Sequence, residues 1–227
     1  EEAGLLLRRV LAGFESLHGK EHQDTLRAVN NLAVYLDNAG DKDGALALYR
    51  RAVAGRRRTL GANNPYTLDS LYNLAAFLWN TEDGGAEAEE IFREARAGCL
   101  ATFGPQHHGT MDCTDRLIDV LEARGAYADA EALCKDLLQS RELADGPLHE
   151  STLRAAATHA SLLASAGQLK EAGEAYRVAV HKHKEALGLD DATTLELTYN
   201  LVCTLEKDES PQEAESVLRQ ALADSQQ

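Results

Sequence analysis

The sequence predicts an all-α fold, a solenoid of repeated helix pairs with about eleven helices in its 227 residues. Three observations predict this fold. Short motifs recur along the whole chain at a nearly constant interval, apolar residues within each interval follow helical spacing, and the composition favours helices. Aromatic residues make up only 5% of the chain and prolines number four, which suits helices built on Ala and Leu better than strands.

The repeat is marked by a Thr followed by Leu or Met, in steps of 42, 43, 42 and 42 residues. A Gly stands six residues before each Thr, and an Ala recurs at the same steps. The threonines are Thr25, Thr67, Thr110, Thr152 and Thr194, and the alanines are Ala45, Ala88, Ala130, Ala172 and Ala214. We therefore expect residues 1–227 to form a single repeat array, with repeats at 19–60, 61–103, 104–145, 146–187 and 188–227.

Each repeat is expected to hold a helix A and a helix B. In the first repeat, one apolar stripe runs from Leu26 to Leu36 and a second from Ala45 to Val53, both at the spacing of one helix face. Helix A should begin after a capping residue, which is His22, Asn64, His107, His149 or Asp191 in successive repeats. Helix A should end at a Gly in four repeats, at Gly40, Gly84, Gly125 and Gly167, whereas the fifth has Ser210-Pro211 there.

Residues 1–18 carry the helix B pattern without a helix A before it. Ala3, Leu6, Leu7 and Val10 stand one period before Ala45 and its stripe, so we expect an orphan helix B here. Apolar residues also remain on the last helix B, so both ends of the array are candidate contact surfaces.

Charge and cysteine usage exclude several classes of function. The chain has 23 Lys and Arg against 37 Asp and Glu, a net charge of −14, which argues against nucleic acid and anionic membranes as partners. No apolar run approaches the roughly 18 residues of a membrane helix. Cys99, Cys113, Cys134 and Cys203 share no metal-binding or disulfide spacing, so we expect free thiols and a cytoplasmic location.

Catalytic motifs are absent from the sequence. It contains no G-x-S-x-G, no H-E-x-x-H and no phosphate-binding loop, and no Cys has a matched His. His181 and His183 stand two apart on a predicted helix and therefore diverge. We expect a protein that is not an enzyme and that has no cofactor and no metal.

The recurring motif resembles a known family. The first repeat reads Gly19, His22, Thr25-Leu26 and then Asn30-Asn31-Leu32-Ala33, and the second repeats this as Leu60-Gly61, Asn64-Pro65, Thr67-Leu68 and Asn73-Leu74-Ala75. This pattern resembles the tetratricopeptide repeat, in particular its kinesin light chain-like subclass with 42-residue repeats. The resemblance implies a right-handed superhelix whose A helices line a concave groove that binds proteins or peptides.

Mapping the ligand-facing positions of that family onto this chain gives a set of candidate groove residues: Arg27, Asn30, Tyr72, Trp79, Asn80, Asp112, Asp115, Asp119, Glu122 and Tyr199. Asp112, Asp115, Asp119 and Glu122 also stand at helical spacing, which places four carboxylates on one helix face. A solvated acidic surface is the alternative interpretation of that face. For Trp79 the alternative is packing against a neighbouring helix, and for the asparagines it is a bond between helices.

The function expected is a non-catalytic interaction scaffold that holds a peptide segment or partner protein in the concave groove. Asparagines would bind the ligand backbone, Tyr72 and Trp79 would anchor an apolar side chain, and the acidic face would favour a basic segment. The alternative is a structural subunit of a larger assembly, held through the array ends and the convex face. We also expect solvated arginines on the first helix B, and a buried neutral imidazole at His159, which replaces a core Leu.

Overall fold

The computed structural model describes residues 2–224 and shows eleven helices and no strand in that part of the chain. The predicted all-α fold is therefore confirmed. By internal contacts the chain divides into two compact units, Glu1–Val120 and Leu121–Gln227. The boundary falls near the end of the helix His108–Ala123.

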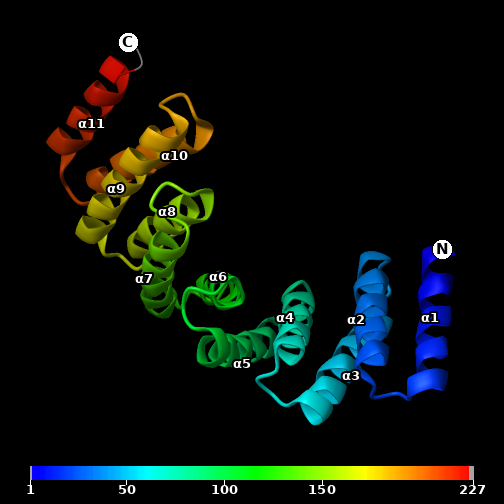
Figure 1. Ribbon diagram of the computed structural model, residues 1–227. Coiled ribbons are helices and arrows are strands. Elements are labelled where there is room, and N and C mark those ends of the chain that lie inside the picture. Colours follow the sequence, from blue (N-terminus) through cyan, green and yellow to red (C-terminus); the bar gives the residue numbers. More distant parts are fainter. Residues whose placement is uncertain (1, 225–227) are drawn as a thin grey trace. The chain divides into compact units, whose positions relative to one another are not determined.

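The first unit contains α1 to α6, which follow one another side by side in chain order (Figure 1). α1 packs on α2, α2 on α3, α3 on α4 and α4 on α5. The helices are α1 (Glu2–His18), α2 (Gln23–Asn38), α3 (Lys42–Leu60), α4 (Pro65–Trp79), α5 (Gly85–Phe103) and α6 (His108–Ala123).

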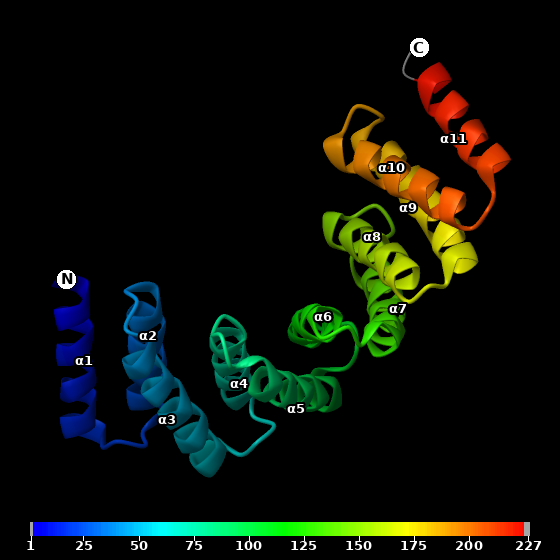
Figure 2. The same ribbon diagram turned by 180° about the vertical axis from the view of Figure 1, so that it is seen from behind.

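The second unit contains the remaining helices, seen from behind in Figure 2, and each of them again packs on the next along the chain. Its core includes Tyr176, Leu197 and Leu201, which join α9 and α10. The helices are α7 (Tyr127–Ala144), α8 (Glu150–Ser165), α9 (Leu169–Leu187), α10 (Ala192–Lys207) and α11 (Pro211–Asp224).

The predicted capping residues all cap an A helix. The Asn64 side chain accepts a hydrogen bond from the Tyr66 N–H at 3.0 Å, and Asp191 accepts from the Thr193 and Thr194 N–H groups. The histidines at this position use Nδ1 as the acceptor, as in the 3.1 Å bond from the Gly109 N–H to His107. Each cap satisfies a backbone N–H that the first helical turn leaves without a partner.

Two helix ends differ from the prediction. Gly84 has φ −83° and precedes α5, so it does not end α4 in the left-handed conformation as Gly40 ends α2. The extra residue of the second repeat lengthens this loop, and α4 already ends at Trp79. In the fifth repeat Glu209 takes the left-handed conformation, with φ 56°, ahead of the Pro211 that begins α11 as predicted.

The orphan helix is present as α1, but it buries a different face from the one predicted. Leu6 and Val10 are 52% and 48% exposed, whereas Gly4 and Leu11 are buried. A side chain at Gly4 would collide with the Tyr35 ring of α2, so α1 and α2 are in close contact there. The predicted stripe stays largely at the surface, because α1 packs on α2 through the face that carries Gly4.

His159 is not the unpaired core imidazole that its position predicts. Its Nε2 lies 2.9 Å from Oε1 of Glu131 on α7, and both side chains are largely buried. Their contact compensates for the removal of the two polar groups from water. At the position where a core Leu was expected, His159 therefore joins α8 to α7 instead of being buried without a partner.

Four arginines of α3 are solvent-accessible, as predicted, and each is also ion-paired, whereas Arg56, which was expected on the same solvated face, is only 4% exposed. Arg50 pairs with Glu87 at 2.9 Å, Arg51 with Glu15 at 2.5 Å and Arg57 with Glu94 at 2.5 Å. Arg58 pairs with Glu21. Each pair joins α3 to a segment about one repeat away, so the basic cluster is largely neutralised by neighbouring carboxylates.

The recurring Thr and Gly are explained by a hydrogen bond that closes the turn into helix A. The hydroxyls of Thr25, Thr67 and Thr110 each donate to the carbonyl of the Gly six residues earlier, at 2.8 Å. The Gly takes a positive φ, for example 91° at Gly61, which favours a residue without Cβ. The hydroxyls of Thr152 and Thr194 are buried without a hydrogen-bond partner.

The hydroxyl of Thr67 is hydrogen-bonded and that of Thr152 is not, so the two threonines give a prediction and its control. Thr67→Val should lower the free energy of unfolding by about 1 kcal/mol, since it removes a hydrogen bond and leaves the Gly61 carbonyl without it. Thr152→Val should leave stability unchanged or raise it, since it removes a buried hydroxyl that has no partner. Urea denaturation of the full chain, followed by helical circular dichroism, measures both effects. Equal losses in the two variants would contradict this account of the turn.

Candidate functional site

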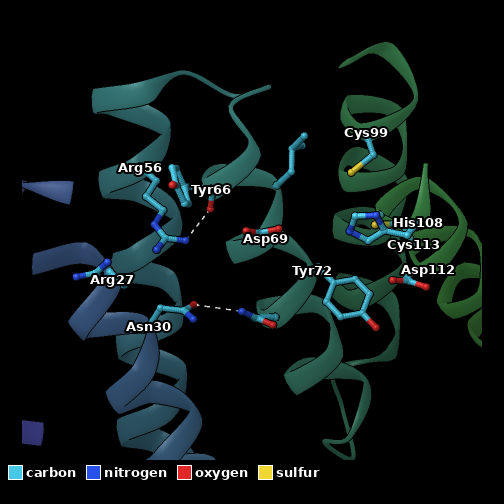
Figure 3. Close-up of a pocket in the computed structure, with 13 residues that line it drawn as sticks. Arg27, Asn30, Arg56, Tyr66, Asp69, Tyr72, Cys99, His108, Asp112 and Cys113 are labelled. Carbon is cyan, nitrogen blue, oxygen red and sulfur yellow. Dashed lines mark hydrogen bonds between the residues drawn. The ribbon is translucent and has the colours of Figure 1, made fainter. Parts of the chain in front are cut away.

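A pocket of about 460 Å³ lies in the first unit, on the side where α2, α4 and α6 face one another (Figure 3). Side chains of α3 and α5 reach into it from the other helix of each repeat. Most of its lining residues have polar side chains, and both signs of charge are present: Arg27, Asn30, Arg56, Tyr66, Leu68, Asp69, Tyr72, Asn73, Cys99, His108, Gly109, Asp112 and Cys113.

Arg56 and Arg27 form the cationic side of the pocket. Arg27 is exposed, but Arg56 is only 4% exposed, and its Nη1 donates to the Tyr66 carbonyl at 2.7 Å and to Ser70 Oγ at 2.8 Å. The Arg56 Nε is buried and has no hydrogen-bond partner. Burial lowers the pKa of Arg56, and nearby Asp69 and Tyr66 oppose that shift.

Asp69 lies between Arg56 and the far side of the pocket, which carries His108 and Asp112 (Figure 3). Asp69 comes from α4, and the other two come from the first turns of α6. Partial burial in the pocket raises the pKa of Asp69, while the charges of Arg56 and His108 act against this shift. The pocket therefore holds two carboxylates and a buried guanidinium in one cavity.

Two asparagines join the walls of α2 and α4. The Asn73 Nδ2 donates to Asn30 Oδ1 at 3.4 Å, a bond that Figure 3 shows across the pocket. For these asparagines the structure thus shows the bond between helices that the sequence analysis gave as the alternative to ligand binding. Both residues still line the pocket, so their amides also meet whatever enters it.

Four of the predicted groove residues are brought together here: Arg27, Asn30, Tyr72 and Asp112. The Tyr72 ring packs edge-on against Phe92 of α5, at 5.9 Å between ring centres. A hydrogen bond with Tyr72 raises the pKa of Arg116, and the nearby carboxylates Asp119 and Asp115 add to this shift. Tyr72 thus has an apolar neighbour, Phe92, on α5 and a polar neighbour, Arg116, on α6.

Trp79 and Asn80 are not part of the pocket lining. Trp79 is half-buried, and its ring lies beside Gly85 at the start of α5, where a Cβ would be 3.8 Å away. Asn80 caps the end of α4 and its Nδ2 donates to the Ala76 carbonyl at 2.9 Å. Both residues stand about two turns beyond Tyr72, so they meet the loop that follows α4 instead.

The acidic face of α6 is only partly a pocket wall. Asp112 lines the pocket, and Asp119 lies 3.0 Å from Nη1 of Arg116 in an ion pair within the helix. Glu122 comes after Val120, where the first unit ends. Tyr199 belongs to α10 of the second unit and is 67% exposed.

The pocket residues that were not predicted from the sequence include two on the B helices, Arg56 and Cys99. Arg56, Cys99, Arg141 and His183 occupy one repeat position and are all buried, so the signal was a polar residue recurring at a core position of helix B. His108 and Cys113 were also missed as pocket residues, because each stands one residue away from a predicted cap or groove position.

Neither a membrane helix nor a metal cluster is found in the part of the chain that the structure describes. No helix there is both long and apolar enough to cross a bilayer. Residues 2–224 also contain no group of three or more His, Cys, Asp or Glu side chains placed to hold a metal ion.

Comparison with known proteins finds one family model that matches part of the sequence and solved structures that match the fold. The tetratricopeptide repeat family model matches residues 25–66 and 67–109. A structure of a kinesin light chain from Podosopora anserina, with nearly identical TPR-like repeats, is 23% identical, covers 90% of this chain and 96% of its own, and has a TM-score of 0.73. BtubC (BKLC) from P. vanneervenii is 17% identical over 97% of this chain and 88% of its own, with a TM-score of 0.71.

A third structure, the assembly chaperone of RpL4 (Acl4), is 19% identical and covers 98% of this chain and 83% of its own, with a TM-score of 0.56. None of the curated proteins compared matches the sequence. Residues 25–109 thus match the tetratricopeptide repeat, and the chain is similar in fold to solved structures with kinesin light chain-like repeats, as the sequence predicts.

Proposed function

We propose that this chain is a non-catalytic interaction scaffold whose first unit binds an extended peptide segment in the pocket between α2, α4 and α6. The observation that carries the proposal is the convergence of predicted ligand-facing residues, Arg27, Asn30, Tyr72 and Asp112, on one open cavity. The fold is typical of protein-interaction scaffolds, and families with it are generally not enzymes.

The charge arrangement favours a ligand with a Lys or Arg side chain on the α6 side. Asp112 is exposed at the pocket wall, and Asp69 faces the same space. The net charge of −14 would raise the encounter rate with a basic segment. Arg56 and Asn30 on the opposite wall would meet peptide carbonyl groups, since both offer N–H donors.

The test uses dye-labelled peptides, because Trp79 lies outside the pocket and its fluorescence would report binding poorly. Two peptides should be compared by fluorescence anisotropy, identical except for a central Lys or Glu. We expect tighter binding of the Lys peptide and a loss of about tenfold in its affinity with Asp112→Asn, the scale of one charge-assisted hydrogen bond.

Asp83→Asn is the matched control, since Asp83 is an exposed carboxylate in the loop before α5 and lies outside the pocket. It should leave the affinity unchanged. Equal binding of the two peptides, or equal losses in the two variants, would contradict the assignment of Asp112 to the ligand. Charge reversal at Asp119 is a poorer test because it also breaks the ion pair with Arg116.

Exposed apolar side chains favour a second candidate function, a structural subunit held in an assembly. Leu5, Leu6, Val10 and Leu17 are 48% to 77% exposed on α1, and Leu218 and Leu222 are 52% and 62% exposed on α11. Large apolar side chains gathered on one helix are typical of contact surfaces.

This candidate predicts that the full chain has a mass above that of its 24.6 kDa monomer in size exclusion with light scattering. Leu6→Glu with Val10→Glu should return it to the monomer, because charges oppose burial of that face. Val178→Glu, at an equally exposed position on α9, is the control and should not change the mass. A monomer at every concentration would exclude self-association through α1.

A further inference from the structure

Two thiols lie together in the wall of the pocket. Cys99 comes from α5 and Cys113 from α6, and both are nearly buried, at 5% and 2% exposed, yet both line the cavity (Figure 3). A Cβ added at Gly109 would lie 3.8 Å from the Cys99 sulfur, so this thiol rests on the first turn of α6. Cys113 stands four residues after Gly109, on the same helix face.

The thiols interact directly and unequally. A hydrogen bond with Cys113 lowers the pKa of Cys99, against the effects of burial, Asp69 and Asp112. The same interaction, together with burial, raises the pKa of Cys113. Cys99 is therefore the better nucleophile of the pair and Cys113 its proton donor.

The other cysteines have different surroundings. The Cys134 thiol is buried and donates to the Ala155 carbonyl at 3.5 Å on α8. Cys203 is half-buried on α10. All four thiols are free in the structure, as predicted, but the sequence spacing gave no sign that helix packing pairs two of them.

We propose that Cys99 and Cys113 form an oxidation site at which a peroxide converts the two thiols into a reversible disulfide. The Cys99 thiolate attacks one peroxide oxygen, the O–O bond breaks, and Cys99 becomes a sulfenic acid while the other oxygen leaves as hydroxide and takes up the Cys99 proton as water. The Cys113 sulfur then attacks the Cys99 sulfur, the S–O bond breaks, and a second water leaves with the Cys113 proton. Two thiols and one hydrogen peroxide thus give one disulfide and two waters.

The pocket supplies what this reaction requires. Buried cysteines are usually inert because reagents do not reach them, but here the cavity of about 460 Å³ opens onto both side chains and admits a molecule as small as hydrogen peroxide. Asp112, the proposed ligand-binding carboxylate, directly precedes Cys113 in α6. Oxidation would therefore modify the same pocket wall, although the thiol chemistry does not depend on peptide binding.

The experiment uses the reduced full chain, a concentration series of hydrogen peroxide, and N-ethylmaleimide to block the remaining thiols before digestion. Trypsin cuts after Arg96 and Arg116, so residues 97–116 form one peptide that contains both cysteines. We expect this peptide to lose the mass of two hydrogens and to carry no maleimide, and dithiothreitol should restore both thiols. Cys134 and Cys203 serve as internal controls and should remain alkylated at the same peroxide concentration.

Variants separate the two roles. In Cys113→Ser, Cys99 should stop at the sulfenic acid and become labelled by dimedone, whereas Cys134→Ser should form the disulfide as the unmodified chain does. The proposal is overturned if residues 97–116 remain doubly alkylated at peroxide concentrations that oxidise Cys203. It is equally overturned if these two cysteines pass to sulfinic or sulfonic acids without a disulfide. A failure of the peptide-binding experiment would leave these outcomes unaffected.

Discussion

Close contact between the two helices of each repeat is the constraint on which the rest of the structure depends. The recurring alanines near the start of the B helices, such as Ala45 and Ala88, have no exposed surface. Later in the same helices, a Cβ at Gly55 would lie 2.5 Å from Leu26, and one at Gly98 would lie 2.4 Å from Leu68. These helix pairs can pack so closely only because the side chains at the contact are small or absent.

The pocket of the first unit follows from this close packing. Arg56 and Cys99 directly follow the two glycines, and they are therefore carried from α3 and α5 to the side where the A helices meet. There Arg56 is held by the Tyr66 carbonyl and the Ser70 hydroxyl of α4, and Cys99 meets Cys113 of α6. The B helices thus contribute side chains to the pocket, whereas the family resemblance predicted ligand-facing residues on the A helices alone.

The sequence predicted the helices and their caps because these depend on local chemistry that a repeat displays several times. The family resemblance also selected Arg27 and Asp112, and both line the pocket of the first unit. The sequence did not specify which partner each side chain contacts. Trp79 turns toward Gly85, Asp119 pairs with Arg116, and the cysteines meet because α5 and α6 pack in one register. Periodicity contains no information about which side chain lies opposite.

We propose that the first unit contains the ligand-binding surface of this chain. Hydrogen exchange of the full chain, read by mass spectrometry with and without the Lys peptide, tests it most directly. Slower exchange in residues 66–73 of α4 and 108–113 of α6, with α9 to α11 unchanged, is the result that the account predicts. Protection confined to α1 or α11, with the first-unit pocket unaffected, would contradict it.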